Sequence, residues 1–291
     1  MSISNYLQKH LVDIKNKKVV VTGANSGIGF EICKNLASLD ASIVMACRSF
    51  LKASKARNKI LKQYKNADIT IIPFDQSTYE SCKQFIELVK KGFSFDVIIF
   101  NAGIFAPKEK KLNKDNYPTT LAVNAINLAY IVDNVTPYLS KDVTIVFQGS
   151  LASSLANKKT SLLNNKLSSF KQYALSKYAL LNYFKYKSLT NKTKNIKYVL
   201  CEPGITNSNI IRNFPKFIRK VGNGFLKTFM MSTEKASLTS IASFASNKSE
   251  NGMMFVPRGF FKIFGYPKAK KIDNKYNESL IKELNSLNHG K

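Results

Sequence analysis

Long apolar runs are missing from this sequence. No stretch reaches the roughly 18 uncharged apolar residues that a membrane-spanning helix requires. The first residues, MSISNYLQKHLVDIKNKK, also lack the apolar centre of a signal peptide. These two absences predict a soluble protein of the cytoplasm.

Cysteine is scarce and scattered along the chain. The four cysteines, at positions 33, 47, 82 and 201, are surrounded by apolar residues, and no CxxC pair or histidine cluster accompanies them. The usual zinc-binding spacings are therefore excluded. We expect reduced thiols in the core and no metal site.

Acidic residues are few. The chain has 18 Asp and Glu against 45 Lys and Arg, a net charge of +27 that would attract nucleic acid, membrane surfaces or cofactor phosphates. The lysines are spread along the whole chain, and basic runs such as KEKK (108–111) and KAKK (268–271) are short. Because no nucleic-acid recognition motif accompanies them, we expect a solvated surface and no specific nucleic-acid partner.

Short apolar runs rich in β-branched residues alternate with helical patterns. The runs span residues 18–23, 42–48, 68–75, 95–103, 143–150 and 196–204, and a seventh lies near 252–256. Near-continuous apolar runs are typical of strands buried on both faces. Their alternation with helices predicts a parallel sheet joined by right-handed crossovers. With no linker or repeat in 291 residues, we expect one α/β domain.

Two helices are marked by apolar residues at helical spacing. One pattern consists of Leu128, Ile131, Val132 and Val135, before Pro137, and the other of Leu280, Ile281, Leu284 and Leu287. Each predicts a helix whose apolar face packs on the domain.

The stretch VVVTGANSGIG (19–29) ends a predicted strand with Gly23, Gly27 and Gly29. Where a strand enters a glycine turn and then a helix, backbone N–H groups and the positive helix end can hold a pyrophosphate. Side chains at these positions would obstruct the turn, the phosphate or the packing of the helix. The same glycines also suit a turn without a ligand, so both interpretations stay open on this stretch alone.

Four motifs together carry a family resemblance: TGANSGIG (22–29), NAG (101–103), YALSK (173–177) and EPG (202–204). In this order and at these distances they resemble the classical short-chain dehydrogenase/reductases over residues 15–265. MACRS (45–49) and the 23-residue interval from Ser150 to Tyr173 are similar to the retinol-dehydrogenase-like branch. The resemblance implies one Rossmann-type, doubly wound domain over residues 1–291 with a seven-stranded, mostly parallel sheet. Cofactor motifs would lie mainly in 15–150, the catalytic and substrate-binding part in 150–265 and a helical tail in 266–291.

The resemblance also implies which residues bind a dinucleotide. They are Gly23, Asn25, Ser26, Gly27, Ile28, Gly29, Arg48, Asp75, Asn101, Ala102, Gly103, Tyr173, Lys177, Pro203, Gly204, Ile205 and Thr206. An arginine after the second strand accommodates a 2′-phosphate, so Arg48 predicts NADP(H) rather than NAD(H), unless it is only a solvated strand end. Asp75 lies beside the adenine or begins a helix. Thr206 is a shifted match for the family threonine that bonds the carboxamide.

Hydride transfer to a carbonyl builds negative charge on oxygen, which calls for a proton donor and a polarising hydrogen bond. Tyr173 and Lys177 lie at i and i+4 on one helix face, so a positive charge is placed to lower the pKa of the phenol. Tyr173 is therefore expected as the general acid/base. By resemblance, Lys177 also binds the nicotinamide ribose, Ser150 polarises the substrate oxygen and Asn124 helps to hold a water in a proton relay. A turn serine and a helix-surface amide are the simpler alternatives for Ser150 and Asn124.

Three positions depart from the family pattern. Phe100 precedes Asn101 in place of a second asparagine, Gly149 precedes Ser150 in place of a second serine, and Asn127 replaces a common glycine. No catalytic group is lost, although Ser153 and Ser154 lie close enough to compete with Ser150 for its assignment.

The segment 205–232 alternates apolar and basic residues. In the family this segment closes over the substrate, which predicts a hydrophobic carbonyl or alcohol; a helix packed on the core and a membrane-surface contact are the alternatives. The expected function is that of an NADP(H)-dependent oxidoreductase acting on a carbonyl/alcohol pair, the alternative being a noncatalytic dinucleotide-binding sensor. A homodimer or homotetramer through the helices carrying Asn124 and Tyr173 is compatible with the apolar segment 178–184, as is burial against the sheet.

Overall fold

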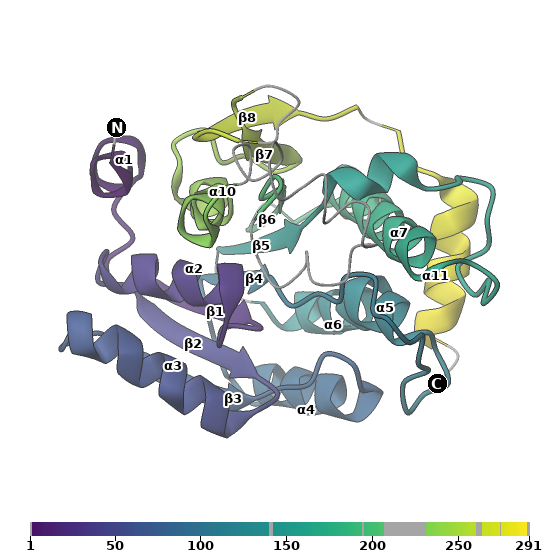
Figure 1. The fold of residues 1–291 in the computed structure, drawn as a ribbon, viewed down its shortest axis with the longest axis horizontal. Coiled ribbons are helices and arrows are strands. Elements are labelled where there is room, and N and C mark those ends of the chain that lie inside the picture. The colour runs from purple at the N-terminus through teal and green to yellow at the C-terminus, as the bar shows by residue number, and fades with distance from the viewer. Residues whose placement is uncertain are drawn as a thin grey trace.

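One sheet of eight strands organises the computed structural model, which describes residues 2–139, 142–193, 195–206, 231–259, 264–273 and 275–289. The strand order is β3-β2-β1-β4-β5-β6-β7-β8 (Figure 1). The strands are β1 (Lys18–Thr22), β2 (Ser42–Cys47), β3 (Ile69–Pro73), β4 (Val97–Phe100), β5 (Val143–Gln148), β6 (Ile196–Cys201), β7 (Met253–Pro257) and β8 (Pro267–Lys271). All seven predicted strands are present, so the α/β class and the mostly parallel sheet are confirmed.

The predicted number of seven strands is wrong by one. β8 pairs antiparallel with β7, from Met253 opposite Lys271 to Pro257 opposite Pro267. It lies in the tail for which only helix was predicted. Its sequence, PKAKK, has no apolar run because β8 is the edge strand, where charged residues can face water and discourage further pairing.

Helices cover both faces of the sheet. On one face lie α2 (Gly27–Ala37), α3 (Phe50–Gln63) and α10 (Thr233–Ala245), with α1 (Ile3–His10) beside them. On the other lie α4 (Tyr79–Lys90), α5 (Thr119–Leu121), α6 (Asn127–Val135), α7 (Ser169–Thr190) and α11 (Glu278–His289). Two apolar clusters fill the spaces between the sheet and these layers, as expected for strands buried on both faces.

Side-chain caps fix where several helices begin. The hydroxyl oxygens of Ser49, Thr78, Ser168 and Ser232 each accept a hydrogen bond from the backbone N–H three residues later, at the starts of α3, α4, α7 and α10. The predicted helix before Pro137 is present, but a π-helical turn at Ala122–Ile126 joins α5 to α6. A 3₁₀ turn that contains Pro137 follows α6.

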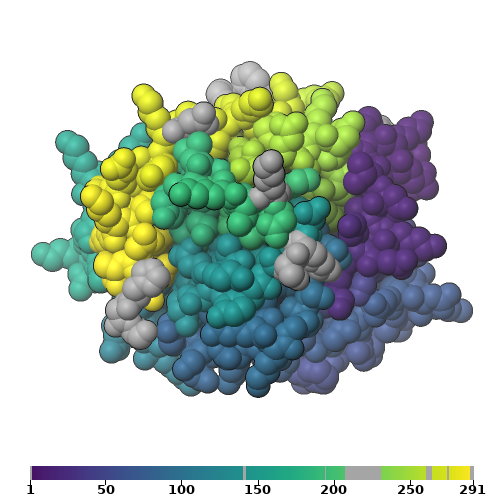
Figure 2. All heavy atoms as spheres, turned by 180° about the vertical axis from the view of Figure 1, so that it is seen from behind, coloured from purple at the N-terminus to yellow at the C-terminus, as the bar shows by residue number. Residues whose placement is uncertain are grey.

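The C-terminal helix α11 packs on α7 and α6. Leu280, Ile281 and Leu284 are buried in the same apolar cluster as α7, and from behind the yellow C-terminal atoms lie against the green and teal ones (Figure 2). No residue of the segment 178–184 is exposed. The chain's own packing therefore accounts for the apolar character of this segment.

All four cysteines are buried and free, which agrees with the predicted core thiols. Within the described ranges, no group of three or more His, Cys, Asp or Glu side chains is placed to hold a metal ion. None of the helices in the described part of the chain has the length and apolar character needed to cross a membrane.

Replacing Leu284 with alanine tests the contribution of α11. Because Leu284 is fully buried, Leu284→Ala is expected to lower the free energy of unfolding by about 2–5 kcal/mol. Urea denaturation followed by circular dichroism measures this change. Leu189→Ala, on an exposed leucine near the end of α7, serves as the matched control and should change stability little. Equal effects of the two substitutions would show that α11 is not docked as described.

Candidate active site and dinucleotide cleft

A cavity of about 500 Å³ lies at the carboxyl ends of the central strands. β1 and β4 are neighbours in the sheet, but the chain leaves them toward helices on opposite faces, which opens a crevice at this switch point. The cavity is lined by Gly23, Asn25, Ser26, Gly27, Ile28, Arg48, Ser49, Lys52, Phe74, Asp75, Gln76, Ser77, Asn101, Ala102, Gly103, Ile104, Val123 and Gln148. Ten of the predicted cofactor residues are among them.

The glycine turn has the shape that a pyrophosphate requires. Gly27 has φ +57°, and a Cβ atom there would meet nothing within 4 Å, so its backbone faces open space. At Gly29 a Cβ atom would lie 2.5 Å from both the Asn101 amide nitrogen and the Gly23 carbonyl oxygen. Ser26, the N-cap of α2, makes no side-chain capping bond to the helix. The first N–H groups of α2 are thus placed to bind an anion.

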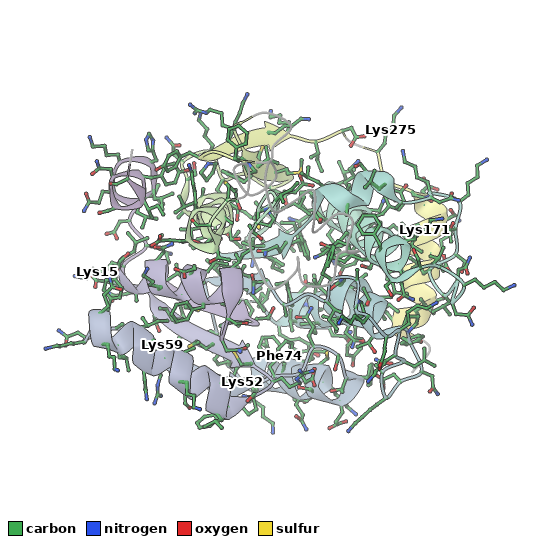
Figure 3. All side chains as sticks on the ribbon, viewed as in Figure 1. Lys15, Lys52, Lys59, Phe74, Lys171 and Lys275 are labelled. Atoms are coloured by element: carbon green, nitrogen blue, oxygen red, sulfur yellow. The ribbon has the colours of Figure 1, made fainter. Side chains whose placement is uncertain are left out.

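The far end of the cavity is basic. Arg48 follows β2 and is exposed, and Lys52 lies in the first turn of α3. Phe74, which follows β3, lines the cavity as well, and Lys52 and Phe74 are both labelled in Figure 3. Asp75 lines the cavity, and its carboxylate also accepts hydrogen bonds from the Ser77 N–H at 2.9 Å and hydroxyl at 2.7 Å. It therefore shapes the turn before α4 while facing the cleft. Because α4 begins at Tyr79 with Thr78 as its N-cap, the expectation that Asp75 begins a helix is wrong, and its position beside the adenine stays a prediction.

The NAG motif ties the end of β4 to the end of β1. The Asn101 side-chain NH₂ donates to the Thr22 carbonyl at 2.9 Å, and the Ala102 N–H donates to the Thr22 hydroxyl at 2.9 Å. On its other side, the side-chain oxygen (Oδ1) of Asn101 accepts from the Gln148 side-chain NH₂ at 3.1 Å. These bonds hold the floor of the cleft.

The structure brings Tyr173, Ser150 and Lys177 together beside this floor. Tyr173 is 8% exposed, its phenol is hydrogen-bonded to the Ser150 side chain, and the Phe105 ring packs edge-on against it with centroids 4.7 Å apart. Lys177, one helical turn later, is 6% exposed and donates to the Gln148 main-chain oxygen at 2.8 Å. Ser153 and Ser154 have no such bond to Tyr173 among the described contacts, which favours Ser150.

Burial shifts the pKa of both catalytic candidates. It raises the pKa of Tyr173 above its ordinary value; the hydrogen bond with Ser150 opposes this shift and the nearby Glu202 charge adds to it. Burial lowers the pKa of Lys177 to about 8. The expected lowering of the Tyr173 pKa by Lys177 is therefore absent, because the ammonium is directed at the Gln148 carbonyl and the desolvation of the phenol dominates.

Asn124 occupies the π-helical turn and is 1% exposed. Its side chain accepts from the Ile104 N–H at 2.9 Å and donates to the Ile104 carbonyl at 2.9 Å and to the Ser176 hydroxyl at 3.0 Å. A Cβ atom at Gly103 would lie 3.3 Å from the Asn124 oxygen and 3.7 Å from the Lys177 nitrogen. Asn124 is thus buried rather than on the helix surface, and it lies across Gly103 from Lys177.

The residues after β6 are not among those that line this cavity. Gly204 has φ +74°, Ile205 is 36% exposed, and Thr206 is buried in an isolated bridge with Met231. Pro203 lies just before Gly204, outside any strand or helix. The segment predicted to close over substrate falls largely on positions 207–230, which lie outside the described residues.

Several lining residues were not predicted. They are Ser49, Lys52, Phe74, Gln76, Ser77, Ile104, Val123 and Gln148. Ser49 and Lys52 follow Arg48 at the start of a helix, and this closeness in sequence was the available signal that they line the same cavity. Gln148 is a polar residue at the end of an apolar strand, which was the available signal for it.

Comparison with known proteins agrees with this geometry. A family model described as short chain dehydrogenase matches residues 17–218. The WW domain-containing oxidoreductase of Homo sapiens is 39% identical over 121 residues, 41% of this chain and 29% of that protein. A Dictyostelium discoideum dehydrogenase/reductase SDR family protein 7-like is 33% identical over 199 residues, 65% of this chain and 59% of that protein. Retinol dehydrogenase 12 of Homo sapiens is 35% identical over 114 residues, 39% of this chain and 36% of that protein. The matched parts are less than two thirds of these relatives' lengths.

Solved structures share the fold. A protein from Mycobacterium Paratuberculosis has a TM-score of 0.72 at 21% identity and covers 96% of this chain and 94% of its own. A short chain dehydrogenase from Burkholderia cenocepacia in complex with NADP has a TM-score of 0.62 at 20% identity, covering 81% of this chain and 93% of its own. With the family model matching well over half of the sequence, the chain belongs to the short-chain dehydrogenase family.

Proposed function

We propose that this protein is an NADP(H)-dependent oxidoreductase that interconverts a carbonyl and an alcohol. The observation that carries the proposal is the grouping of Tyr173, Ser150 and Lys177 beside Gly103, at one end of a cleft that suits a dinucleotide. A noncatalytic sensor would need the cleft but not the proton donor. The intact group of three therefore favours the enzyme.

The residues divide the chemistry between them. The nicotinamide, when bound, supplies hydride to the carbonyl carbon. Ser150 donates a hydrogen bond to the substrate oxygen, and Tyr173 gives that oxygen its proton. The raised pKa keeps the phenol protonated at neutral pH, which suits reduction of the carbonyl. Lys177 would bind the nicotinamide ribose, and a relay through Lys177 and Asn124 would return a proton to the phenolate.

Arg48 and Lys52 support the preference for NADP(H). Both line the adenosine end of the cavity, and no acidic residue follows β2. A 2′-phosphate would accept hydrogen bonds from these two cations and from the Ser49 hydroxyl at the start of α3. The Burkholderia cenocepacia structure in complex with NADP has the same fold.

A hydrophobic substrate is proposed from the surroundings of Tyr173. Phe105 packs against the phenol, Phe170 packs edge-on against Phe105, and Leu155 is 67% exposed on the 3₁₀ turn that follows Ser150. An apolar wall beside a proton donor would bind a carbonyl compound that carries a bulky apolar group.

The remaining partners are also proposals. We propose that the protein is cytoplasmic. We also propose that it has no specific nucleic-acid partner, which the positions of Lys15, Lys171 and Lys275 on separate parts of the surface support (Figure 3). Membrane-surface contact by residues 205–232 stays the less favoured alternative. Self-association through α6 and α7 would have to accommodate α11, which already packs on both helices.

Replacing the Tyr173 hydroxyl tests the reaction. Tyr173→Phe should reduce turnover of a panel of aldehydes and ketones by about 10²–10⁴-fold, because it removes the proton donor. NADPH consumption measures turnover, and the Kd for NADPH should change little. Tyr178→Phe, on a half-buried tyrosine of the same helix, is the matched control. Wild-type turnover by the Tyr173 variant would refute the mechanism. If the protein bound NADPH but reduced no carbonyl, the sensor would be favoured.

Removing the cations at the adenosine end tests the cofactor. Arg48→Met and Lys52→Met should each weaken NADPH binding about 10–100-fold and leave NADH binding nearly unchanged, because only NADPH carries the 2′-phosphate. Isothermal titration calorimetry gives both dissociation constants. Lys59→Met, on an exposed lysine of α3 outside the cavity lining, is the control. Tighter binding of NADH than of NADPH by the wild type would overturn the assignment.

The buried Lys177 should make stability depend on pH. Its pKa is about 8 in the folded protein against 10.5 ordinarily, so between these values the unfolded chain binds more protons at this residue. Stability contributed by Lys177 therefore rises as pH increases from about 8 to 10.5. Relative to Lys177→Met, the wild type should gain stability over this range in urea denaturation. Lys171→Met, on an exposed lysine of α7, should show no such difference. A constant gap between wild type and Lys177→Met would contradict the burial of this ammonium.

A further inference from the structure

Gln148, the last residue of β5, joins parts of the site that are distant in the sequence. Its main-chain oxygen accepts from the Lys177 ammonium at 2.8 Å. Its side-chain NH₂ donates to the side-chain oxygen (Oδ1) of Asn101 at 3.1 Å, and its side-chain oxygen accepts from the Ser240 hydroxyl on α10 at 3.0 Å. Gln148 is 7% exposed and Ser240 is fully buried. One residue thus contacts the catalytic lysine, the NAG motif and a helix behind the sheet.

The Gln148 side chain determines which way the Asn101 amide faces. A carboxamide presents an acceptor on one side and a donor on the other. Because the Gln148 NH₂ binds the Asn101 oxygen, the Asn101 NH₂ faces the carbonyls of Thr22 and Gly23, at 2.9 Å and 3.4 Å. The Asn101 nitrogen also lies where a side chain at Gly29 would be. The orientation of this amide therefore supports the glycine turn and the start of α2.

The Gln148 amide is in turn oriented from behind. Ser240 donates to its oxygen and lies 3.3 Å from the Cys201 sulfur, so the far end of the chain of bonds is anchored in the core. Burying an amide in this position costs free energy unless its polar atoms are paired, and an apolar side chain would serve packing alone. In the two hydrogen bonds that link Ser240 to Gln148 and Gln148 to Asn101, the donor and the acceptor are both defined.

We propose that Gln148 is a positioning residue for the dinucleotide: its side chain orients Asn101 beneath the pyrophosphate turn, while its main chain holds Lys177 at the nicotinamide end. The proposal rests on the proposed function, since it concerns the cofactor of that reaction. Gln148 acts through Asn101 and need not touch the cofactor. The end of β5 would then fix the position of Lys177 relative to the glycine turn.

Gln148→Met tests the proposal, because methionine keeps the length of the side chain but has no amide. The variant should raise the Kd for NADPH about tenfold, the effect of losing a buried hydrogen bond beneath the binding turn. Gln148→Glu, which keeps an acceptor for Ser240 but has no NH₂ for Asn101, should weaken binding at least as much. Isothermal titration calorimetry with NADPH measures Kd well below the melting temperature of each variant, so that only folded protein is compared.

Ser240→Ala and Ser243→Ala form the matched pair. Both serines are fully buried on α10, but the Ser243 hydroxyl donates to the main-chain oxygen of Ser240 and not to Gln148. Ser240→Ala should raise the Kd for NADPH several-fold, whereas Ser243→Ala should leave it unchanged even if its melting temperature falls. This pair keeps the proposal testable if the Gln148 variants fail to fold.

The outcomes separate this proposal from the proposed function. If the wild type binds NADPH but Gln148→Met and Ser240→Ala bind it equally well, the positioning role is refuted and the proposed function stands. Equal weakening by Ser240→Ala and Ser243→Ala would also refute it, because general loosening of α10 would then suffice. If the wild type binds neither NADPH nor NADH, both proposals fall together. Because Kd needs no turnover, a missing substrate does not affect the result.

Discussion

The buried ammonium of Lys177 is the interaction on which the arrangement of this site depends. Removing a cation from water is costly, and the carbonyl at the end of β5 offsets part of that cost only if α7 is held at a fixed height and rotation over the sheet. The apolar residues of α7 provide this rigidity, with the sheet on one side and α11 on the other. Since Tyr173 lies one turn earlier on the same helix, the packing that positions Lys177 also positions the phenol.

The segment between Ser150 and Tyr173 needs its own anchors because it has little regular structure. The Glu283 carboxylate on α11 accepts from the Ser161 hydroxyl at 2.6 Å and from the Leu162 N–H at 2.9 Å. From another part of the chain, the Lys110 ammonium donates to the carbonyls of Asn165 and Leu167. A helix distant in sequence and the segment after β4 thereby hold the approach to α7. The tail thus does more than cover the core, because it restrains the segment that joins two catalytic candidates.

The sequence predicted those features that local patterns encode. Apolar β-branched runs identified seven strands, and helical spacing placed Tyr173 and Lys177 on one face. β8 was missed because an edge strand needs no apolar run, and Gln148 was missed because its partners, Asn101 and Ser240, are distant in the chain. The predicted lowering of the Tyr173 pKa was wrong for the same kind of reason. It depends on burial beneath Phe105 and on the Glu202 charge, which only the folded arrangement brings near the phenol.

Burial and position in the cleft also distinguish the few positive charges proposed to act in binding or catalysis from the many on the surface. Exposed cations are screened within about 8–10 Å at physiological salt, so the net charge of +27 cannot discriminate between anions by itself. Arg48 and Lys52 line a concave site, where an anion would come within hydrogen-bonding distance, so under the proposed function they are the cations that would recognise a 2′-phosphate. Lys177 is shielded from water, so its charge is only weakly screened, which suits the role in proton transfer that we propose for it. In a lysine-rich chain, composition therefore says little about function, whereas burial distinguishes the lysine proposed for proton transfer from the two cations proposed for cofactor recognition.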